Sequence, residues 1–409
     1  MTDLATVGHD QAAIERLVTG HMRRFPWYAD LVRRSGAASH ALDSLPLLDQ
    51  TVLEAHYYGA PALPDADTFL TSGTSGGFRK AIQYSASDDD AYVAQRRRLF
   101  ADFLAPLRKG AVAVADLGTG HAAASARRVF LDLGLDARDI DFMSPLQEHV
   151  AKLNAWQPDV LFTMPMILDQ ILQAVPGLTA RPRKVIVVGD LAPPAWREHV
   201  ATRFGIGVED VLDILGSIEI GAIAYLDTRS GRYVFHDHII AEVMDPSPVD
   251  GEPARCRDHG DGVLVLTSLA RDYFPAVRYV TGDLVSGLAR TEVDGRVVTT
   301  CERLLGRVNG DVKHGERISS YDLGQAVARV FPGRPFEVSE DGGTLCVRIV
   351  SEGITDEQRQ ALIGAVRAAA PDVANMIDSG LVGAIAVVPI SLQELRSGRG
   401  KRRFNLSEA

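Results

Sequence analysis

Cysteine is scarce in this chain: 409 residues contain Cys256, Cys301 and Cys346, far apart in the sequence. An odd number of widely spaced cysteines provides neither a disulfide framework nor a CxxC metal pair, and a reducing compartment fits best. Long apolar runs are also missing, because none approaches the ~18 residues of a membrane helix. The polar, acidic start lacks the basic and apolar regions of a signal peptide. We therefore expect a cytoplasmic protein without a transmembrane helix.

The chain also has no excess of positive charge. Forty-three basic residues stand against fifty-three acidic ones, which gives a net charge of −10. This balance disfavours general adhesion to nucleic acid or to anionic membranes, and a polyanionic substrate is not expected. Apolar residues at 46% and charged residues at 23% are ordinary for a soluble globular enzyme. A prior of roughly 100–200 residues per domain predicts two to four domains.

Strand and helix signals alternate between about residue 88 and residue 215, which predicts an α/β fold with a mostly parallel sheet. The predicted helices are 88–104, 165–175 and 194–203, and the predicted strands are 111–115, 159–163 and 184–188. Ligands of such sheets normally lie beyond the carboxyl ends of the strands. Thr163, Gly189 and Ile214 are at these predicted ends.

From about residue 231 the pattern changes to short strands separated by Gly, Pro and Asp, such as 232–235, 239–244 and 262–267. A small α+β unit follows, with helices near 321–330 and 355–370 and strands near 336–338, 344–349 and 381–388. We therefore predict an N-terminal core at 1–305, with a β-rich subdomain at about 231–305. A mobile C-terminal domain is predicted at 306–409, with a hinge near residue 309.

A segment rich in glycine and hydroxyl groups, Thr71-Ser-Gly-Thr-Ser-Gly-Gly-Phe-Arg-Lys80, is the most informative motif. Such a loop can turn backbone N–H groups toward a phosphate, with hydroxyls and a cation as further donors. A flexible surface turn is the alternative from composition alone. A Walker loop is excluded because Phe78 stands where its second glycine belongs, and no GxGxxG opens a βαβ unit.

Four further motifs follow in order: Leu215-Gly-Ser-Ile-Glu219, Tyr279-Val-Thr-Gly-Asp283, Gly306-Arg-Val-Asn-Gly310 and Gly400-Lys401. With the loop at 71–80, they resemble the motifs of the adenylate-forming superfamily of acyl-CoA synthetases, peptide-synthetase adenylation domains and luciferase. The segments 236–243 and 264–283 resemble the sequences of phenylacetate–CoA ligases. The resemblance implies that a carboxylate attacks the α-phosphate of ATP, and that a thiol or another nucleophile then displaces AMP.

The resemblance also implies roles for single residues. Glu219 would coordinate Mg²⁺, Asp283 would accept from the ribose hydroxyls, Arg307 would reach the ribose or the phosphates, and Lys401 would move onto the reacting carboxylate. Lys401, Glu219 and Arg307 are thus the expected catalytic residues. The expected nucleotide site comprises Thr71, Ser72, Gly73, Thr74, Ser75, Gly76, Lys80, Gly189, Asp190, Gly216, Ser217, Arg278 and Asp283.

Each of these residues also has a purely structural alternative. Glu219 could start a surface helix, Asp283 could cap a turn, and Arg307 could form a hinge salt bridge. Lys401 stands among Arg396, Arg399, Arg402 and Arg403, and such a charge run is usually a solvated tail.

The chain departs from the family pattern at several positions. Leu215 replaces the adenine-stacking tyrosine, Ile218 replaces a phosphate-contacting hydroxyl residue, and Asn309 replaces the hinge aspartate. A zinc site known from some relatives needs at least three ligands, and only a convergence of His236, Cys256 and Cys301 could supply them. A binding or regulatory protein with weakened nucleotide binding is therefore the alternative to an enzyme.

The acyl pocket is expected at predicted strand ends, with candidates His121, Thr163, Met164 and Leu215. His121 could equally be a satisfied histidine at a helix start. The branch favours an aromatic or small cyclic acid, with ATP and Mg²⁺ as cofactors. The expected partners are that carboxylic acid and CoA or a carrier-protein thiol, with an amine as a further acceptor. We expect a monomer or homodimer.

Overall fold

The computed structural model describes residues 11–37, 41–70, 80–118, 121–174, 177–246, 255–308, 312–397, 400–402 and 404. The chain forms two compact units, each built from separate segments. The first comprises Met1–Arg96, Gly216–Ala224 and Tyr233–Glu302, and the second comprises Arg97–Leu215, Tyr225–Arg232 and Arg303–Ala409. The predicted α/β fold class is confirmed, since sheets and helices alternate along the chain.

The first unit is built mainly on antiparallel strands. Its sheet order is β11-β10-β12-β13-β14-β9, and β1 pairs separately with β2. Its strands are β1 (Asp67–Leu70), β2 (Ala81–Tyr84), β9 (Arg232–Phe235), β10 (Ile239–Met244), β11 (Cys256–Arg257), β12 (Gly260–Ser268), β13 (Tyr279–Val293) and β14 (Arg296–Cys301). Its helices are α1 (Gln11–Arg24), α2 (Pro26–Ser35), η1 (Leu42–Ser44) and α3 (Gln50–His56). Helix α4 (Ala86–Leu104) and strand β8 (Gly221–Asp227) each pass from this unit into the second.

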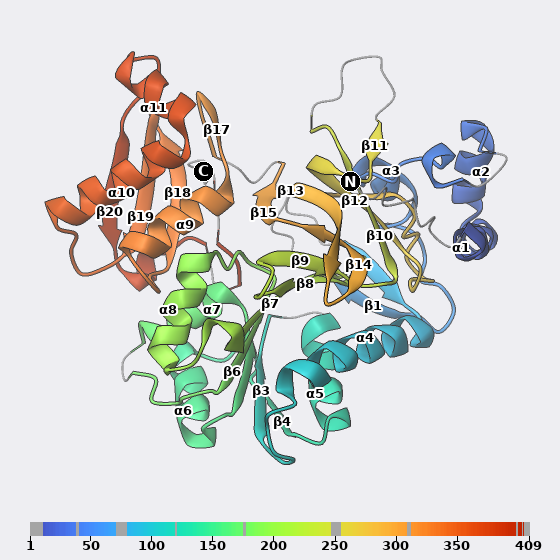
Figure 1. Cartoon of the computed structure of the whole chain (residues 1–409), viewed down its shortest axis with the longest axis horizontal. Helices are drawn as coiled ribbons and strands as arrows, with labels where there is room; N and C mark the ends of the chain where they lie inside the picture. The colour runs from blue at the N-terminus through green and yellow to red at the C-terminus, as the bar shows by residue number, and fades with distance from the viewer. Residues whose placement is uncertain are drawn as a thin grey trace. The chain divides into compact units, whose positions relative to one another are not determined.

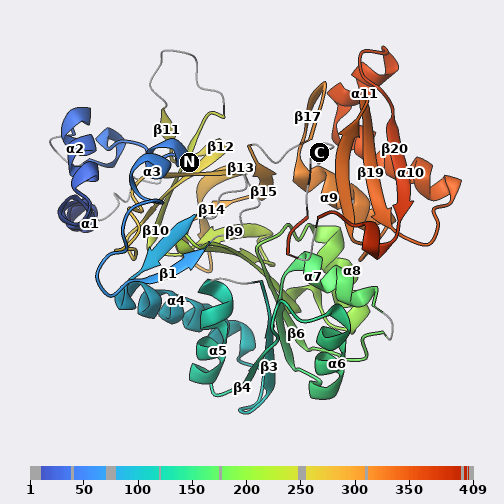
Figure 2. The ribbon, with the colours of Figure 1, turned by 180° about the vertical axis from the view of Figure 1, so that it is seen from behind.

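The second unit contains the predicted parallel sheet, in the order β4-β3-β5-β6-β7. Helix α5 lies on one face, and α6, α7 and α8 lie on the other (Figures 1 and 2). The strands are β3 (Val112–Asp116), β4 (Asp136–Asp139), β5 (Val160–Thr163), β6 (Lys184–Val188) and β7 (Val211–Ser217). The helices are α5 (His121–Asp132), α6 (Leu146–Trp156), α7 (Pro165–Leu172), α8 (Pro194–Phe204) and η2 (Val208–Asp210). Strand β7 runs on past Ile214 to Ser217, so the predicted strand end at Ile214 is wrong.

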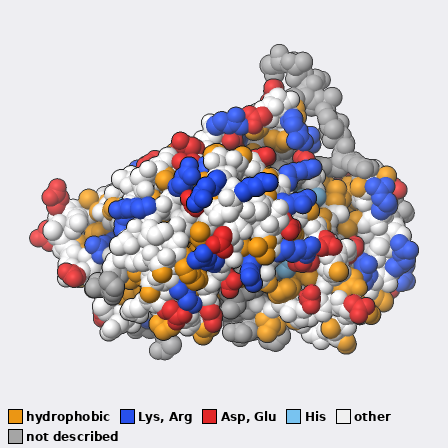
Figure 3. Space-filling model, turned by 90° about the horizontal axis from the view of Figure 1, so that it is seen from below, with side chains coloured by type: hydrophobic (Ala, Val, Ile, Leu, Met, Phe, Trp, Pro, Cys, Tyr) orange, Lys and Arg blue, Asp and Glu red, His pale blue; other side chains and the backbone are white. Residues whose placement is uncertain are grey.

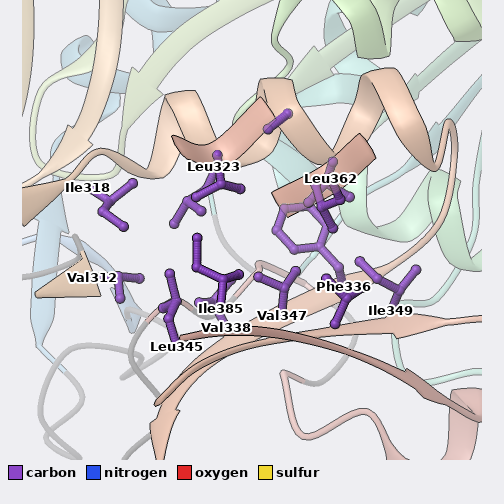
Figure 4. Packing of buried hydrophobic residues seen from close by; sticks show 14 of the residues in the cluster. Val312, Ile318, Leu323, Phe336, Val338, Leu345, Val347, Ile349, Leu362 and Ile385 are labelled. Carbon is purple, nitrogen blue, oxygen red and sulfur yellow. The ribbon is translucent and has the colours of Figure 1, made fainter. Parts of the chain in front are cut away.

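The C-terminal part of the second unit places β18, β19 and β20 in one sheet, with α9 and α10 packed over it. In Figure 4, Leu323 of α9 and Leu362 of α10 point toward Leu345 and Val347 of β19. The elements are β15 (Arg303–Arg307), β16 (Val312–His314), β17 (Glu316–Ile318), α9 (Ser320–Val330), β18 (Phe336–Asp341), β19 (Thr344–Val350), α10 (Asp356–Ala369), α11 (Pro371–Asp378), β20 (Ile385–Ile390) and η3 (Leu392–Glu394).

The predicted division between residues 305 and 306 falls inside β15. The predicted hinge residue Asn309 lies outside the described residues. The domain boundary therefore stays a prediction. Across the described part of the chain, no helix is long and apolar enough to cross a membrane. On the face shown in Figure 3, acidic and basic side chains are interspersed.

A buried histidine is expected to make the stability of the first unit depend on pH. His21 of α1 is 1% exposed and stacks on Phe25. Burial, together with the nearby Arg24 and Arg271 cations, lowers the pKa of His21 from 6.5 to about 3, although Asp88 opposes the shift. Between these two pKa values the unfolded chain binds the extra proton. The free energy of unfolding should therefore fall as the pH falls, by about 1.4 kcal/mol per pH unit for one proton.

We expect His21→Phe to remove the part of this pH dependence that comes from His21. Below pH 6.5 the unfolding free energy of the variant should then depend less steeply on pH than that of the unaltered protein. Urea unfolding at several pH values measures the two slopes. His259→Gln is the control, because the His259 side chain is 73% exposed and should leave the slope unchanged. Equal slopes for His21→Phe and the unaltered protein would contradict the account of His21.

Candidate active site

The second unit places Lys401 at the carboxyl ends of the parallel strands. Its Cε lies 3.9 Å from the position that a Cβ on Gly189 would take, directly after β6. The Cε of Met164 lies 3.2 Å from that same position, directly after β5. Three residues expected at the active site, Lys401, Gly189 and Met164, are therefore neighbours. Gly189 has a φ of +83° in addition to these close neighbours, so a larger residue would be strained there.

Arg402 fixes the chain directly after Lys401. Its side chain is 3% exposed and donates to Asp169 of α7, to Asp190 at 2.9 Å and to the carbonyl of Leu191 at 2.9 Å. The indole N–H of Trp196 donates to the other oxygen of Asp169 at 2.7 Å. Burial raises the pKa of Asp169, and the Arg402 cation and the Trp196 hydrogen bond oppose that shift. Arg402 thus belongs to a buried ion cluster and not to a solvated tail.

Glu337 fixes the same segment on the other side of Lys401. Its carboxylate is fully buried and accepts from the backbone N–H groups of Arg396 at 2.8 Å and Ser397 at 3.1 Å. Arg348 lies 3.0 Å from the same carboxylate. Lys401, which is itself exposed, therefore stands between two buried anchors. This limits the conformations that its backbone can adopt.

The remaining candidates of the second unit lie in several different elements. His121 begins α5 and is buried, and Thr163 ends β5. The Oγ1 atom of Thr163 is buried and has no hydrogen-bond partner among the described residues. Leu215 is half-buried in β7, and Arg307 is exposed in β15. Asp190 is largely occupied, because Arg402 and the N–H of Leu191 donate to its two oxygens.

In the first unit, Glu219 lies in the turn between β7 and β8, and its backbone is held from two sides. The hydroxyl of Tyr84 donates to the carbonyl of Ile218 at 2.8 Å, and Nε of Arg271 donates to the carbonyl of Glu219 at 2.9 Å. Ser217 accepts from the N–H of Ile220 at 3.1 Å through its hydroxyl. These bonds fix the turn that carries the half-buried Glu219 side chain.

Arg271 is the centre of a second buried network. It lies 2.6 Å from Asp88 of α4, and both side chains are at most 2% exposed. Its guanidinium also covers the Tyr84 ring at 3.8 Å and donates to the carbonyl of Gln83 at 3.0 Å. Since Gln83 and Tyr84 end β2, Arg271 connects β2, α4 and the Glu219 turn.

The other nucleotide-site candidates of the first unit have different surroundings. Lys80 donates to Gln50 at 3.1 Å, and Asp283 is half-buried in β13, where its N–H donates to the Thr281 hydroxyl. Arg278 is buried, pairs with Glu242 at 3.1 Å and donates to the carbonyls of Asp43 and Leu45. We therefore assign Arg278 to the fold and leave it out of the proposed site.

Part of the predicted site lies outside the described residues, namely Thr71, Ser72, Gly73, Thr74, Ser75 and Gly76. The strands next to that loop are described, and Leu70 of β1 pairs with Ala81 of β2. No group of three or more His, Cys, Asp or Glu in the described part of the chain could hold a metal ion. Mg²⁺ takes few protein ligands and otherwise binds water and phosphate oxygens, so the single carboxylate of Glu219 suits it.

Sequence reasoning missed the residues that position the candidates within each unit, namely Arg271 in the first unit and Arg402 and Glu337 in the second. A signal existed for Arg402, because Asp169 is a charged residue in the mainly apolar helix Pro165–Leu172 and must find a cation when buried. No signal identifies Arg271 or Glu337, since their partners are distant in the sequence.

Comparisons with known proteins show the family of the chain. Residues 313–393 match the family model described as the fumarate–diaminopropanoate ligase C-terminal domain. The chain is 42% identical over 394 residues to fumarate–(S)-2,3-diaminopropanoate ligase of Enterobacter agglomerans, which covers 96% of this chain and 98% of that protein. It is 24% identical over 320 residues to phenylacetate–coenzyme A ligase of Thermus thermophilus, covering 72% of this chain and 69% of that protein.

A 2-hydroxyisobutyryl-CoA ligase with bound 2-HIB-AMP has the same fold. Its TM-score is 0.77 at 16% identity, and the match covers 97% of this chain and 88% of that one. The chain belongs to the adenylate-forming superfamily, in its phenylacetate–CoA ligase-like branch. It is an ATP-dependent ligase of the adenylate-forming type.

Proposed function

We propose that this chain activates a small dicarboxylic acid of the fumarate type as its acyl-adenylate and joins it to an amino group of a small diamino acid. One observation carries the proposal: the 42% identity to fumarate–(S)-2,3-diaminopropanoate ligase extends over 98% of that protein. The identity to the Thermus thermophilus phenylacetate–CoA ligase is 24% over 69% of its length. Amide formation is therefore favoured over the thioester formation expected from the sequence motifs.

The proposed reaction has two steps. A carboxylate oxygen bonds to the α-phosphorus of ATP while the bond to the β-phosphate oxygen breaks, which releases pyrophosphate. The amine nitrogen then bonds to the acyl carbon, the bond between that carbon and the phosphate oxygen breaks, and AMP leaves as the nitrogen loses a proton. The first step brings two anions together, so it needs cations where charge develops.

The chain offers a cation and a metal ligand for that first step. Lys401 would neutralise the carboxylate and the α-phosphate from its place beside Gly189 at the end of β6. Glu219 would hold Mg²⁺, which balances charge on the phosphate oxygens. Asp283 would accept from the ribose, with Gly216, Ser217 and Lys80 as further nucleotide contacts. The loop at 71–79 and Arg307 would complete the phosphate site.

A substrate panel tests the proposal. We expect fumarate to support exchange of labelled pyrophosphate into ATP, and phenylacetate to support little. With fumarate and ATP, 2,3-diaminopropanoate should give an amide detectable by mass spectrometry, whereas CoA should give no thioester. Exchange with phenylacetate and a CoA thioester as product would instead establish an aromatic acid–thiol ligase.

That acid–thiol ligase is the second candidate, and the phenylacetate–CoA ligase likeness favours it. A carrier-protein thiol is tested in the same panel as a third acceptor. Exchange with none of the acids would favour the weakened nucleotide-binding protein that Leu215 and Ile218 suggest.

A further inference from the structure

One arginine in the first unit is buried, and no anion among the described residues pairs with it. Three arginines follow one another in α4, and Arg97 and Arg98 are exposed whereas Arg96 is 2% exposed. Tyr92, Arg96 and Phe100 are spaced by four residues and are all buried, so they share the inner face of the helix. Arg96 therefore occupies a position where a helix normally carries an apolar residue.

The bonds of Arg96 do not balance its charge. Its Nε donates to the Tyr92 hydroxyl at 3.4 Å, and its guanidinium lies 5.4 Å from the Tyr92 ring centroid. Its Nη1 is buried without a hydrogen-bond partner, and no ion pair joins Arg96 to any residue that the structure describes. Three other buried arginines, Arg271, Arg278 and Arg402, each pair with a carboxylate. A buried unpaired charge is costly, so an anionic group of a ligand would be stabilised beside Arg96.

The guanidinium lies against the motif that contains Glu219. A Cβ on Gly216 would stand 2.7 Å from Nη2 of Arg96, so only glycine fits while Arg96 keeps its place. A Cβ on Gly221 would stand 3.4 Å from the Tyr92 ring. Gly216 lies three residues before Glu219, the proposed magnesium ligand. The unpaired cation is thus next to the turn where the acyl-adenylate would be held.

A neighbouring histidine does not compete for the anion. Nε2 of His238 donates to the carbonyl of Ala222 at 3.0 Å. Burial lowers the pKa of His238 to about 4; the bond to Ala222 opposes this shift, while the Arg96 cation adds to it. His238 is therefore neutral near pH 7, which leaves Arg96 as the cation of this cluster.

We propose that Arg96 binds the far carboxylate of a short dicarboxylic acid while the near carboxylate is adenylated. This assignment rests on the proposed function and makes Arg96 the residue that selects dicarboxylic over monocarboxylic acids. A guanidinium suits the role because its planar donors match a carboxylate with two parallel hydrogen bonds. The amino acid acceptor also carries a carboxylate, and pyrophosphate exchange separates the two sources because it needs no acceptor.

The test compares fumarate with its monomethyl ester, which lacks the far charge, in pyrophosphate exchange. In the unaltered enzyme kcat/KM should be at least about 30-fold higher for fumarate, as expected for a buried charge pair. Arg96→Met should lower kcat/KM for fumarate by a similar factor, mainly through KM, and leave the ester nearly unchanged. Arg97→Met, which alters the exposed neighbour, should change neither value. Arg96→Met should also fold, because methionine fills an apolar position without burying a charge.

Each outcome has a separate meaning. Exchange with neither acid overturns the proposed function and the role of Arg96 with it. Efficient exchange with fumarate that persists in Arg96→Met overturns the role of Arg96 alone. Normal exchange combined with a raised KM for the amino acid in amide formation would assign Arg96 to the acceptor and also overturn it. Should Arg96→Met fail to fold, equal kcat/KM for fumarate and its ester in the unaltered enzyme would still refute the assignment.

Discussion

Lys401→Ala is expected to lower the rate of adenylate formation by about 10²–10³-fold, the usual effect of removing one donor that stabilises developing charge. Lys401 lies beside Gly189 and Met164 at the strand ends, and its backbone is anchored at Glu337 and through Arg402. The loss should appear in pyrophosphate exchange. Conversion of a supplied acyl-adenylate should remain largely intact, because its carboxylate has already been activated.

The matched control for this variant is Lys313→Ala, which removes an exposed lysine from β16 of the same unit. It should leave both reactions unchanged. Equal loss of both reactions in Lys401→Ala, together with a lowered melting temperature, would mean that Lys401 has a structural role.

Arg402→Met should destabilise the protein by about 3–5 kcal/mol, because it leaves buried carboxylates without a cation. Asp169 is 1% exposed and Asp190 is 6% exposed, so neither can be solvated well without local opening. Urea or thermal unfolding measures the loss. Arg296→Met is the control, since Arg296 is 71% exposed and pairs with an exposed aspartate.

A double variant separates the buried charge from the lost packing. Arg402→Met combined with Asp169→Asn should recover part of the stability, because the orphaned charge is removed while Trp196 keeps a hydrogen-bond acceptor. Adenylation should stay slow in both variants, since the segment that carries Lys401 has lost its anchor. If Arg402→Met were as stable as the unaltered protein, the claim that the buried ion cluster stabilises the fold would be wrong.

The sequence predicted the regular elements of the second unit well. Strand β6 at 184–188 and helix α8 from residue 194 lie where the apolar runs and the proline placed them. The last strand is a correction: it begins at Ile385 and not at Leu381. The reason is local, because the N–H groups of Leu381 and Val382 donate to the carbonyl of Met376 and turn the chain after α11.

The active-site motifs were readable because each is a short segment, whereas the contacts that position them were not. Arg271 meets Asp88 across 183 positions and Arg402 meets Asp169 across 233, and no local pattern encodes such pairs. Arg96 is an intermediate case. Its spacing of four from Tyr92 and from Phe100 is visible in the sequence, yet only the folded chain shows that it is buried and that no described carboxylate pairs with it.

The central claim is that the carboxylic acid is activated as an adenylate before the amine attacks. Fumarate labelled with a heavy oxygen isotope in its carboxylates tests it directly, with ATP and 2,3-diaminopropanoate present. The account predicts that AMP gains one heavy oxygen for each amide formed, because the attacking carboxylate oxygen stays with the phosphate. Unlabelled AMP, or the label in inorganic phosphate, would contradict it.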